Sequence, residues 1–240
     1  MIPQKIHFIW FGRNPYPEKV QYCMESWKKH LPDYEFKLWN EDSFPIEQYR
    51  FTKEAYEEKK FAFVSDFVRI YALATEGGIY LDTDIEVLKS FDNLLGKRVF
   101  LGTDDSGNLT ALMASEKGHP FFMHILNLYQ KRPFLLGNGK LDTEVNNLLL
   151  ERELTKWGFI VKNETQHLHE GIEVYPDDFF HVVSLVSGKM NKTQNSYAIH
   201  WHTLLWVSWK TRFIRFLRMK ILVPILGRNL YSKLTSFIKQ

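Results

Sequence analysis

Residues 77–87 read Gly77-Gly78-Ile79-Tyr80-Leu81-Asp82-Thr83-Asp84-Ile85-Glu86-Val87 and give the clearest indication of the fold. Its two glycines tolerate the left-handed backbone with which helices end, so a preceding helix is expected to stop there. The apolar run that follows is typical of a buried strand. Since alternate residues of a strand share a face, the even-numbered side chains are expected to point away from the core, and two of them are aspartates.

Asp82 and Asp84 are the first candidates for function. In a strand this apolar, two neighbouring carboxylates would repel each other and resist desolvation. A divalent cation would resolve the conflict, because hard cations bind carboxylate oxygens and leave positions for substrate phosphates. The competing interpretation is a polar strand end with two solvated aspartates, and it is the better one for an isolated Asp-x-Asp. Here the two-glycine turn and the apolar run favour function.

A second group of polar residues, Ser65, Asp66 and Arg69, lies in a segment that is otherwise apolar. Residues 53–76 are predicted to form a helix, in which positions three apart share a face. A surface ion pair is the usual outcome for such residues, but a buried pair is costly and indicates a function. An aspartate accepts hydrogen bonds from sugar hydroxyls, and an arginine suits phosphate oxygens.

The rest of the chain alternates predicted strands and helices. Strands are expected at 5–10, 34–39, 79–87, 99–102, 110–114, 172–175 and 197–201, and helices at 18–30, 53–76, 119–131 and 142–155. This order predicts an α/β sheet that is largely parallel, with helices on its faces. Trp10 closes the first strand, where it is expected in the core or at an interface.

The segment His200-Trp201-His202-Thr203-Leu204-Leu205-Trp206-Val207-Ser208-Trp209 is rich in histidine and tryptophan. A neutral imidazole can bind a metal or donate to a phosphate. One of the two histidines can equally be a core residue with its hydrogen bonds satisfied.

Charge divides the chain of 240 residues unevenly. Of its 31 lysines and arginines, ten follow Asp178, the last of its 28 acidic residues. Residues 210–240 are predicted to form a basic amphipathic helical tail that lies on an anionic membrane. The alternative is a helix docked on the catalytic domain with a solvated basic rim.

Composition also indicates the cellular compartment in which the protein is expected. The single cysteine, Cys23, excludes an internal disulfide and favours a reducing compartment. The first residues do not resemble a signal peptide, and there is no stretch of about 18 apolar residues to span a membrane. The sequence therefore predicts a cytoplasmic protein, peripheral on the inner face of the cell membrane, with nucleic acid absent from its expected partners.

Taken in order, these motifs resemble glycosyltransferase family 32. The resemblance rests on Ile6-His7-Phe8-Ile9-Trp10, Ser26-Trp27, Pro32-Asp33-Tyr34, Leu38-Trp39-Asn40, Ala62-x-x-Ser65-Asp66-x-x-Arg69, Gly77 to Asp84, His200 and Ser208-Trp209. It spans roughly residues 3–209, and the middle block is its most specific part. That family includes capsule and other polysaccharide sugar transferases, yeast mannosyltransferases and, more distantly, clostridial glucosylating toxins.

The resemblance implies a GT-A fold, a single Rossmann-like nucleotide-binding domain over residues 1–209, followed by the tail at 210–240. It implies a retaining transfer of a hexose from a nucleotide-diphosphate sugar, preferably a UDP-sugar, to a polysaccharide or lipid-linked oligosaccharide acceptor, with Mn²⁺ or Mg²⁺. It implies that Asp66, Arg69, Asp82 and Asp84 are catalytic, with Asp66 and Arg69 holding the donor sugar and its phosphate. The implied donor-binding residues are Trp10, which would stack on the base, Ser65, Tyr80, and Ser208 and Trp209 in a closing loop. The implied metal ligands are Asp84, Asp82 and either His200 or His202.

Two other functions compete. A phosphotransferase with an Asp-x-Asp nucleophile usually carries a threonine two residues after the pair, where this chain has Glu86. A non-catalytic, membrane-associated sugar-binding scaffold would suit the aromatic residues and the basic tail. A scaffold function would not explain why Asp66, Arg69, Asp82 and Asp84 are present.

Overall fold

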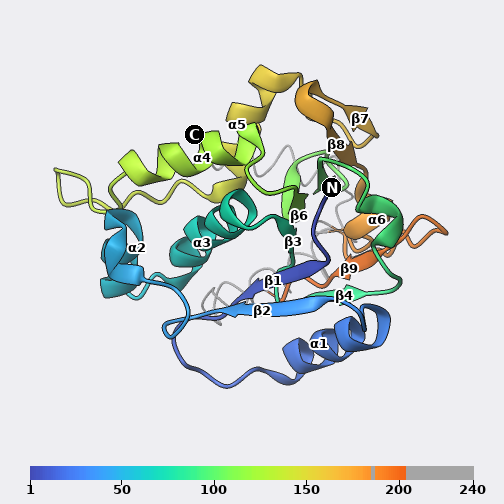
Figure 1. Cartoon of the computed structure of the whole chain (residues 1–240), viewed down its shortest axis with the longest axis horizontal. Helices are drawn as coiled ribbons and strands as arrows, with labels where there is room; N and C mark the ends of the chain where they lie inside the picture. Colours follow the sequence, from blue (N-terminus) through green and yellow to red (C-terminus); the bar gives the residue numbers. More distant parts are fainter. Residues whose placement is uncertain (185–186, 204–240) are drawn as a thin grey trace.

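The computed structural model describes residues 1–184 and 187–203, with the backbone alone at residues 110 and 111. The described residues form an α/β fold with a seven-stranded sheet and a separate two-stranded sheet (Figure 1). Ser208, Trp209, the predicted tail and the predicted domain boundary lie outside the described residues.

The larger sheet has the strand order β2-β1-β3-β6-β5-β8-β7. Its strands are β1 (Lys5–Ile9), β2 (Glu35–Trp39), β3 (Gly78–Tyr80), β5 (Val99–Thr103), β6 (Leu109–Ser115), β7 (Gln166–His167) and β8 (Ile172–Tyr175). Strands β1, β2 and β3 pair in parallel, as do β5 and β8, whereas β6 pairs antiparallel with both β3 and β5, and β7 with β8. The predicted, largely parallel sheet was therefore wrong in part, because three of the six described pairings in this sheet are antiparallel.

The smaller sheet pairs β4 (Ile85–Val87) with β9 (Ala198–His200) in antiparallel fashion. It brings residues from the late part of the chain beside those that follow Asp84. The indole N–H of Trp27 donates to the carbonyl of Ile85 at 2.6 Å, and the hydroxyl of Ser26 accepts from the amide of Val87 at 2.9 Å. These bonds fasten β4 to the helix that precedes β2.

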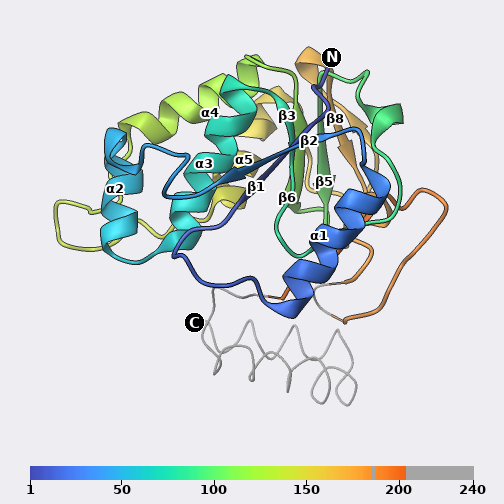
Figure 2. The same cartoon turned by 60° about the horizontal axis from the view of Figure 1, so that its bottom comes forward.

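Helices cover both faces of the larger sheet. Those of eight residues or more are α1 (Glu18–His30), α2 (Arg50–Glu57), α3 (Phe61–Thr75), α4 (Pro120–Lys131) and α5 (Asn146–Leu154). Figure 2 shows α1 on one side of the sheet and α2, α3, α4 and α5 on the other. The shorter helices are α6 (Asp177–Phe180) and the 3₁₀ turns η1 (Ile46–Gln48), η2 (Asp92–Leu94), η3 (Thr155–Trp157) and η4 (His169–Gly171).

The period of two in the strands divides the core into two layers. On β5, Val99 and Leu101 pack with the α3–α4 side, whereas Phe100 packs with the α1 side. On β6, Met113 faces the first layer and Leu112 the second. Both faces of the central strands are buried, so only residues at the strand ends can meet a substrate.

Two predicted elements are broken where the backbone departs from the regular pattern. The helix predicted over 53–76 is two helices, because Lys59 adopts a left-handed conformation with φ of 55° between α2 and α3. The strand predicted over 79–87 is β3 and β4, with a turn between them. Helix α5 begins at Asn146 and not at residue 142.

Gly77 and Gly78 end α3 and begin β3, as predicted. Both have positive φ, 70° and 109°. A Cβ on Gly78 would lie 2.7 Å from the carbonyl oxygen of Lys5, so a larger residue could not approach β1 this closely.

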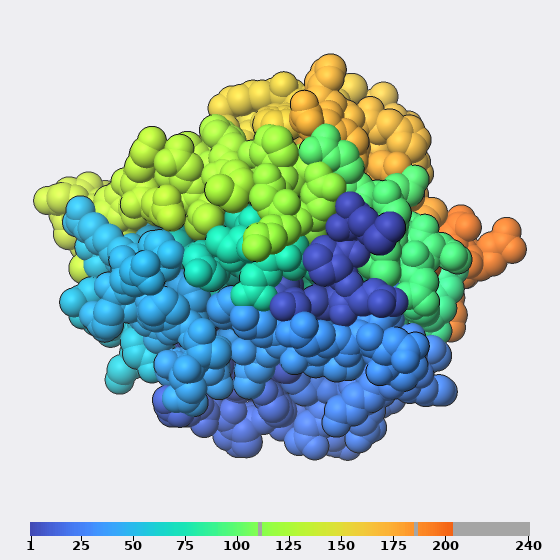
Figure 3. Space-filling model, in the orientation of Figure 1, coloured from blue at the N-terminus to red at the C-terminus, as the bar shows by residue number. Residues whose placement is uncertain are grey.

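The first residues of the chain lie at the surface against the segment near residue 95 (Figure 3). There the amide of Ile2 donates to the carbonyl of Leu95 at 2.9 Å, and Ile2 itself is buried. No helix in the described part of the chain has the length and apolarity that crossing a bilayer requires.

Candidate active site

The candidate site begins in the turn at Leu81–Asp84, at the carboxyl end of β3. Leu81 is still held to β1, because its amide donates to the carbonyl of His7 at 3.0 Å. The amide of Ile85 then donates to the carbonyl of Asp82 at 3.0 Å and closes the turn. The predicted alternation of faces therefore fails at Asp82 and Asp84, which reach their partners from a turn and not from a strand. The predicted location, at the carboxyl end of a central strand, is where open sheets bind ligands.

His200 lies between the two aspartates. Its Nε2 atom is 3.2 Å from a carboxylate oxygen of Asp84 and 3.9 Å from one of Asp82. The other oxygen of Asp84 accepts from the amide and the hydroxyl of Thr203 at 2.7 and 2.8 Å. The pairing of β4 with β9 sets this geometry, since it places Ile85 opposite His200.

The electrostatics of the Asp84–His200 pair follow from its burial and its partners. Burial alone would raise the pKa of Asp84, but the imidazole of His200 and the bonds from Thr203 outweigh it and hold that pKa below its usual range. Burial alone would lower the pKa of His200, but the two carboxylates outweigh it and raise that pKa. Asp84 is therefore an ionised carboxylate although this residue is only 8% exposed.

Arg69 joins the helix to the turn. Its guanidinium lies 3.2 Å from a carboxylate oxygen of Asp66 on the same helix and 3.5 Å from one of Asp82. Its Cζ atom also lies 4.6 Å from the ring centre of Tyr80, and the Tyr80 hydroxyl donates to Asp82 at 2.5 Å. Burial opposes the charge of Arg69, but Tyr80 and the two aspartates outweigh it and raise its pKa. The structure thus brings Arg69 together with Asp66, Tyr80 and Asp82.

Asp66 is held in this group at an electrostatic cost. Burial raises the pKa of its carboxyl from 3.8 to about 6, against the opposing effect of Arg69 and of a backbone amide. That amide belongs to Asn146, which donates to Asp66 at 3.3 Å, and the Asn146 side chain donates to the backbone carbonyl of Asp66 at 2.8 Å. Sequence reasoning missed Asn146, because 80 residues separate it from Asp66 and no motif marks it.

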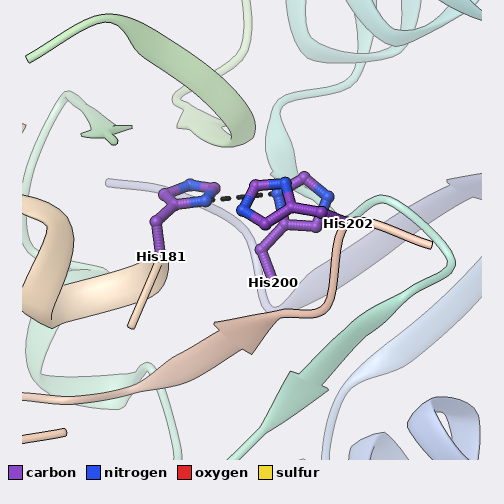
Figure 4. Close-up of side chains that lie close together, drawn as sticks. All are labelled: His181, His200 and His202. Carbon is purple, nitrogen blue, oxygen red and sulfur yellow. Dashed lines mark hydrogen bonds between the residues drawn. The ribbon is translucent and has the colours of Figure 1, made fainter. Parts of the chain in front are cut away.

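Two further histidines complete the surroundings of His200. His202 lies with its ring centre 3.9 Å from that of His200, and His181 has its Nδ1 atom 3.2 Å from Nδ1 of His200 (Figure 4). Burial and the neighbouring imidazoles lower the pKa of His181 well below its usual value. Sequence reasoning singled out His202 but missed His181, which follows two phenylalanines in a stretch with no spacing signal.

Two further predicted site residues, Trp10 and Ser65, make local contacts. Trp10, which follows β1, is partly exposed and donates from its indole N–H to the carbonyl of Asn14 at 2.6 Å. Its ring centre lies 5.1 Å from that of Tyr16. Ser65 donates to the carbonyl of Phe61 at 3.1 Å, one turn back in α3. No contact joins the side chains of Trp10 or Ser65 to the aspartates in the described residues, so their predicted roles stay predictions.

The donor set suits a divalent cation. Asp82, Asp84 and His200 each offer one ligand atom, and these atoms lie within 4.8 Å of one another. Two carboxylates and one imidazole are the mixture of hard and intermediate ligands that suits Mn²⁺ and, less well, Mg²⁺. Of the two late histidines, His200 groups with Asp82 and Asp84, whereas His202 groups with His181 and His200.

Comparison with known proteins agrees with this geometry. The model of the family described as "Glycosyltransferase sugar-binding region containing DXD motif" matches residues 17–101, which include Asp66, Arg69, Asp82 and Asp84. The match concerns this region of the chain, which contains the Asp-x-Asp motif. The resemblance to glycosyltransferase family 32 is thereby confirmed for the block that carries its most specific motifs.

The chain matches only part of the length of its curated relatives. The chain is 33% identical over 130 residues to inositol phosphoceramide mannosyltransferase 3 of Schizosaccharomyces pombe, covering 52% of this chain and 36% of that protein. It is 32% identical over 136 residues to lactosylceramide 4-alpha-galactosyltransferase of Mus musculus, covering 56% of this chain and 36% of that protein. The chain thus spans about a third of the length of these two relatives.

Among solved structures, the chain is similar to the PaToxG glycosyltransferase, with a TM-score of 0.51 and 21% sequence identity. The match covers 65% of this chain and 69% of that chain. At this identity the similarity concerns the fold alone. It confirms the predicted α/β, GT-A-like architecture for the described residues.

The raised pKa of Asp66 predicts a pH-dependent stability. The unfolded chain ionises Asp66 near pH 3.8, whereas the folded protein keeps the proton up to about pH 6. The folded state therefore binds more protons between these values, and Asp66 lowers stability as the pH rises through this window, by up to about 3 kcal/mol. Asp66→Asn cannot ionise, so its melting temperature relative to wild type should rise by roughly 5–10 °C between pH 4 and pH 7.

The measurement is a melting curve at each pH, with a chelator present throughout. Asp33→Asn serves as the matched control, because Asp33 is exposed and lies before the amino end of β2, whereas the site lies at the carboxyl end of β3. A constant difference between Asp66→Asn and wild type across the pH range would show that Asp66 is not held protonated.

Proposed function

We propose that this chain is a metal-dependent glycosyltransferase that moves a hexose from a nucleotide-diphosphate sugar to an acceptor hydroxyl. One observation carries the proposal: Asp82, Asp84, His200 and Arg69 converge at the carboxyl end of β3. All of these residues except His200 lie inside the region that matches the sugar-binding family. Carboxylates for a cation beside a buried guanidinium are what a nucleotide diphosphate requires. The names of the relatives, a mannosyltransferase and a galactosyltransferase, support a hexose.

Asp82, Asp84 and His200 would hold the cation, which when bound would neutralise the negative charge that develops on the departing diphosphate. Mn²⁺ is favoured over Mg²⁺, because an imidazole is among the ligands. Thr203 holds Asp84 in place through two hydrogen bonds. The cation site is therefore preorganised from three separate parts of the chain: the turn after β3, the end of β9 and the loop that follows it.

Arg69 would provide fixed positive charge close to the diphosphate. Its contacts with Asp66 and Asp82 hold the guanidinium in one orientation before the donor arrives, so little reorganisation is needed in the transition state. Asp66, behind Arg69, would accept hydrogen bonds from the hydroxyls of the donor sugar. Tyr80 supports Arg69 through its ring and Asp82 through its hydroxyl.

The proposed transfer retains the configuration at the sugar. The acceptor oxygen would form its bond to the anomeric carbon on the face from which the phosphate oxygen leaves, and the acceptor proton would pass to the departing diphosphate. This route needs no covalent enzyme nucleophile. Trapping a glycosyl adduct on a carboxylate of this chain would overturn it.

For the donor base we propose uridine, stacked on Trp10. The ring is partly exposed and lies just after β1, whose carboxyl end is at the same edge of the sheet as that of β3. Its indole N–H is already bound to Asn14, which fixes the ring plane. Guanosine is the alternative base. Ser208 and Trp209 keep their proposed role in a loop that closes on the donor.

For the acceptor we propose a sugar hydroxyl on a lipid-linked oligosaccharide, with a capsule-type polysaccharide as the alternative. The support is the naming of ceramide substrates among the relatives and the charge of the tail at 210–240. An anionic membrane surface on the cytoplasmic side would then be the place of work.

The test of the catalytic proposal is release of nucleoside diphosphate from UDP-glucose, UDP-galactose and GDP-mannose, with Mn²⁺ or with a chelator. Wild type should turn over one donor in Mn²⁺, and Asp84→Asn should lose at least about 100-fold, the scale of removing a group that stabilises transition-state charge. Asp33→Asn, which changes an exposed aspartate before the amino end of β2, should stay within about twofold.

Other outcomes separate the competing functions. Phosphate release from a simple phosphoester would favour the phosphotransferase. That reaction has little support, since Glu86 is engaged by the indole of Trp201 and the hydroxyl of Tyr22, both at 2.9 Å. Donor binding without turnover of any of the three sugars would favour the scaffold.

The membrane proposal has its own test. Full-length protein should sediment with vesicles that contain phosphatidylserine and not with neutral vesicles, and binding should weaken as salt rises. Replacing Arg212, Arg215 and Arg218 with glutamine should reduce sedimentation at least about tenfold, at about 1 kcal/mol for each cation. Replacing Lys28 and Lys29 on α1 provides the matched control. Unchanged sedimentation in the arginine variant would contradict the proposal.

A further inference from the structure

Three imidazoles meet beside the carboxylate site and form a second donor set of a different kind. His181 directly follows α6, His200 ends β9, and His202 lies two residues further along the chain. Figure 4 shows the rings of His200 and His202 one over the other, with His181 facing His200. One nitrogen from each ring lies within 4.8 Å of the other two.

The distances fit a common ion. The Nδ1 atoms of His181 and His200 are 3.2 Å apart. Two nitrogens bound at about 2.0–2.1 Å to a tetrahedral ion are about 3.3 Å apart, which is nearly this separation. The ring centres of His200 and His202 are 3.9 Å apart and those of His181 and His202 are 6.2 Å apart, so a rotation of His202 about its side-chain bonds completes the set.

The backbone is held in an unusual conformation to bring the rings together. His202 has a φ of 52°, in the left-handed region that residues other than glycine rarely adopt. His181 is packed against the end of β5, where a Cβ on Gly102 would come within 3.2 Å of its Nε2 atom. The glycine leaves room for this ring.

The two donor sets differ in the ions that they prefer. Asp82 and Asp84 are hard oxygen ligands, whereas three imidazoles are nitrogen ligands that favour Zn²⁺, Ni²⁺ or Cu²⁺ over Mn²⁺ and Mg²⁺. His200 belongs to both sets: its Nε2 atom faces Asp84 and its Nδ1 atom faces His181. We propose that His181, His200 and His202 form a second cation site, selective for borderline transition metals such as Zn²⁺, that competes with the Asp82–Asp84 site for His200.

This proposal concerns binding and does not depend on glycosyl transfer. A neutral imidazole has only one unprotonated nitrogen, so a His200 that binds a cation through Nδ1 carries its proton on Nε2 and cannot also bind a cation there. The site at Asp82 and Asp84 then loses its nitrogen ligand and holds Mn²⁺ less tightly. The two cations therefore exclude each other through one shared side chain.

The experiment is calorimetric titration of full-length, chelator-stripped protein with Zn²⁺ and with Mn²⁺. Asp84→Asn isolates the second site, since it removes a ligand from the carboxylate site alone. It should lose Mn²⁺ affinity at least tenfold and keep one equivalent of Zn²⁺. Adding His181→Phe to Asp84→Asn should lower Zn²⁺ affinity at least tenfold, and adding His202→Asn should do the same, with asparagine chosen because it tolerates the left-handed backbone.

The matched control is Asp84→Asn with His167→Asn, which removes an exposed histidine on the edge strand β7 and should leave Zn²⁺ affinity unchanged. In wild type, saturation with Zn²⁺ should weaken Mn²⁺ binding. Equal Zn²⁺ affinity in Asp84→Asn with and without His181→Phe and His202→Asn would overturn the proposal. So would a loss of Mn²⁺ affinity in His181→Phe alone as large as the loss for Zn²⁺, because His181 would then act as a hydrogen-bond partner that positions His200.

Discussion

A single buried guanidinium, that of Arg69, holds together the parts of the protein on which the site depends. It lies between Asp66 on its own helix and Asp82 in the turn after β3, at 3.2 and 3.5 Å. Without it, two carboxylates would share a poorly solvated space, and each would resist ionisation. With it, the turn is tied to α3 on one side of the sheet. The antiparallel pairing of β4 with β9 ties the same turn to His200 on the other side.

This arrangement shows how a sheet with both faces buried can still present chemistry. Five strands of the larger sheet run in one direction, and β6 and β7 run in the other. The reversal of β6 keeps β3 and β5 pointing the same way while placing their ends one strand apart. The carboxylates after β3 and His181, which packs against the end of β5, therefore lie at the same ends of the strands. His200 is the residue common to both.

Much of this could be predicted from sequence because it is local. The glycines that end α3, the spacing of Asp66 and Arg69 in a helix, and the pair of aspartates after an apolar run all appear within 20 residues. The family resemblance added His200, which no local rule could link to Asp84. The break between α2 and α3 was missed, because it depends on the backbone of Lys59, a residue with no turn preference.

What the sequence could not show arises from contacts between distant segments. Asn146 meets Asp66 across 80 residues, and His181 meets His200 through the packing of α6 on β5 and β9. Strand direction has the same origin. An apolar run such as that of β6 is compatible with either direction, and its neighbours decide between them. Each of these contacts is set by tertiary packing and leaves no periodic trace in the chain.

We expect Asp82, Asp84 and His200 to bind a cation that in turn binds a nucleoside diphosphate. The melting temperature with UDP, GDP or CDP, each with Mn²⁺ or with chelator, tests this for wild type and Asp84→Asn. A ligand bound only to the folded state at about 100 times its Kd stabilises by about 2.7 kcal/mol, a rise of about 5 °C or more. One of the three nucleotides should produce this rise, and it should do so only when Mn²⁺ is present. Asp84→Asn should abolish the rise. No rise with any nucleotide at saturation, or an equal rise in Asp84→Asn, would contradict this expectation.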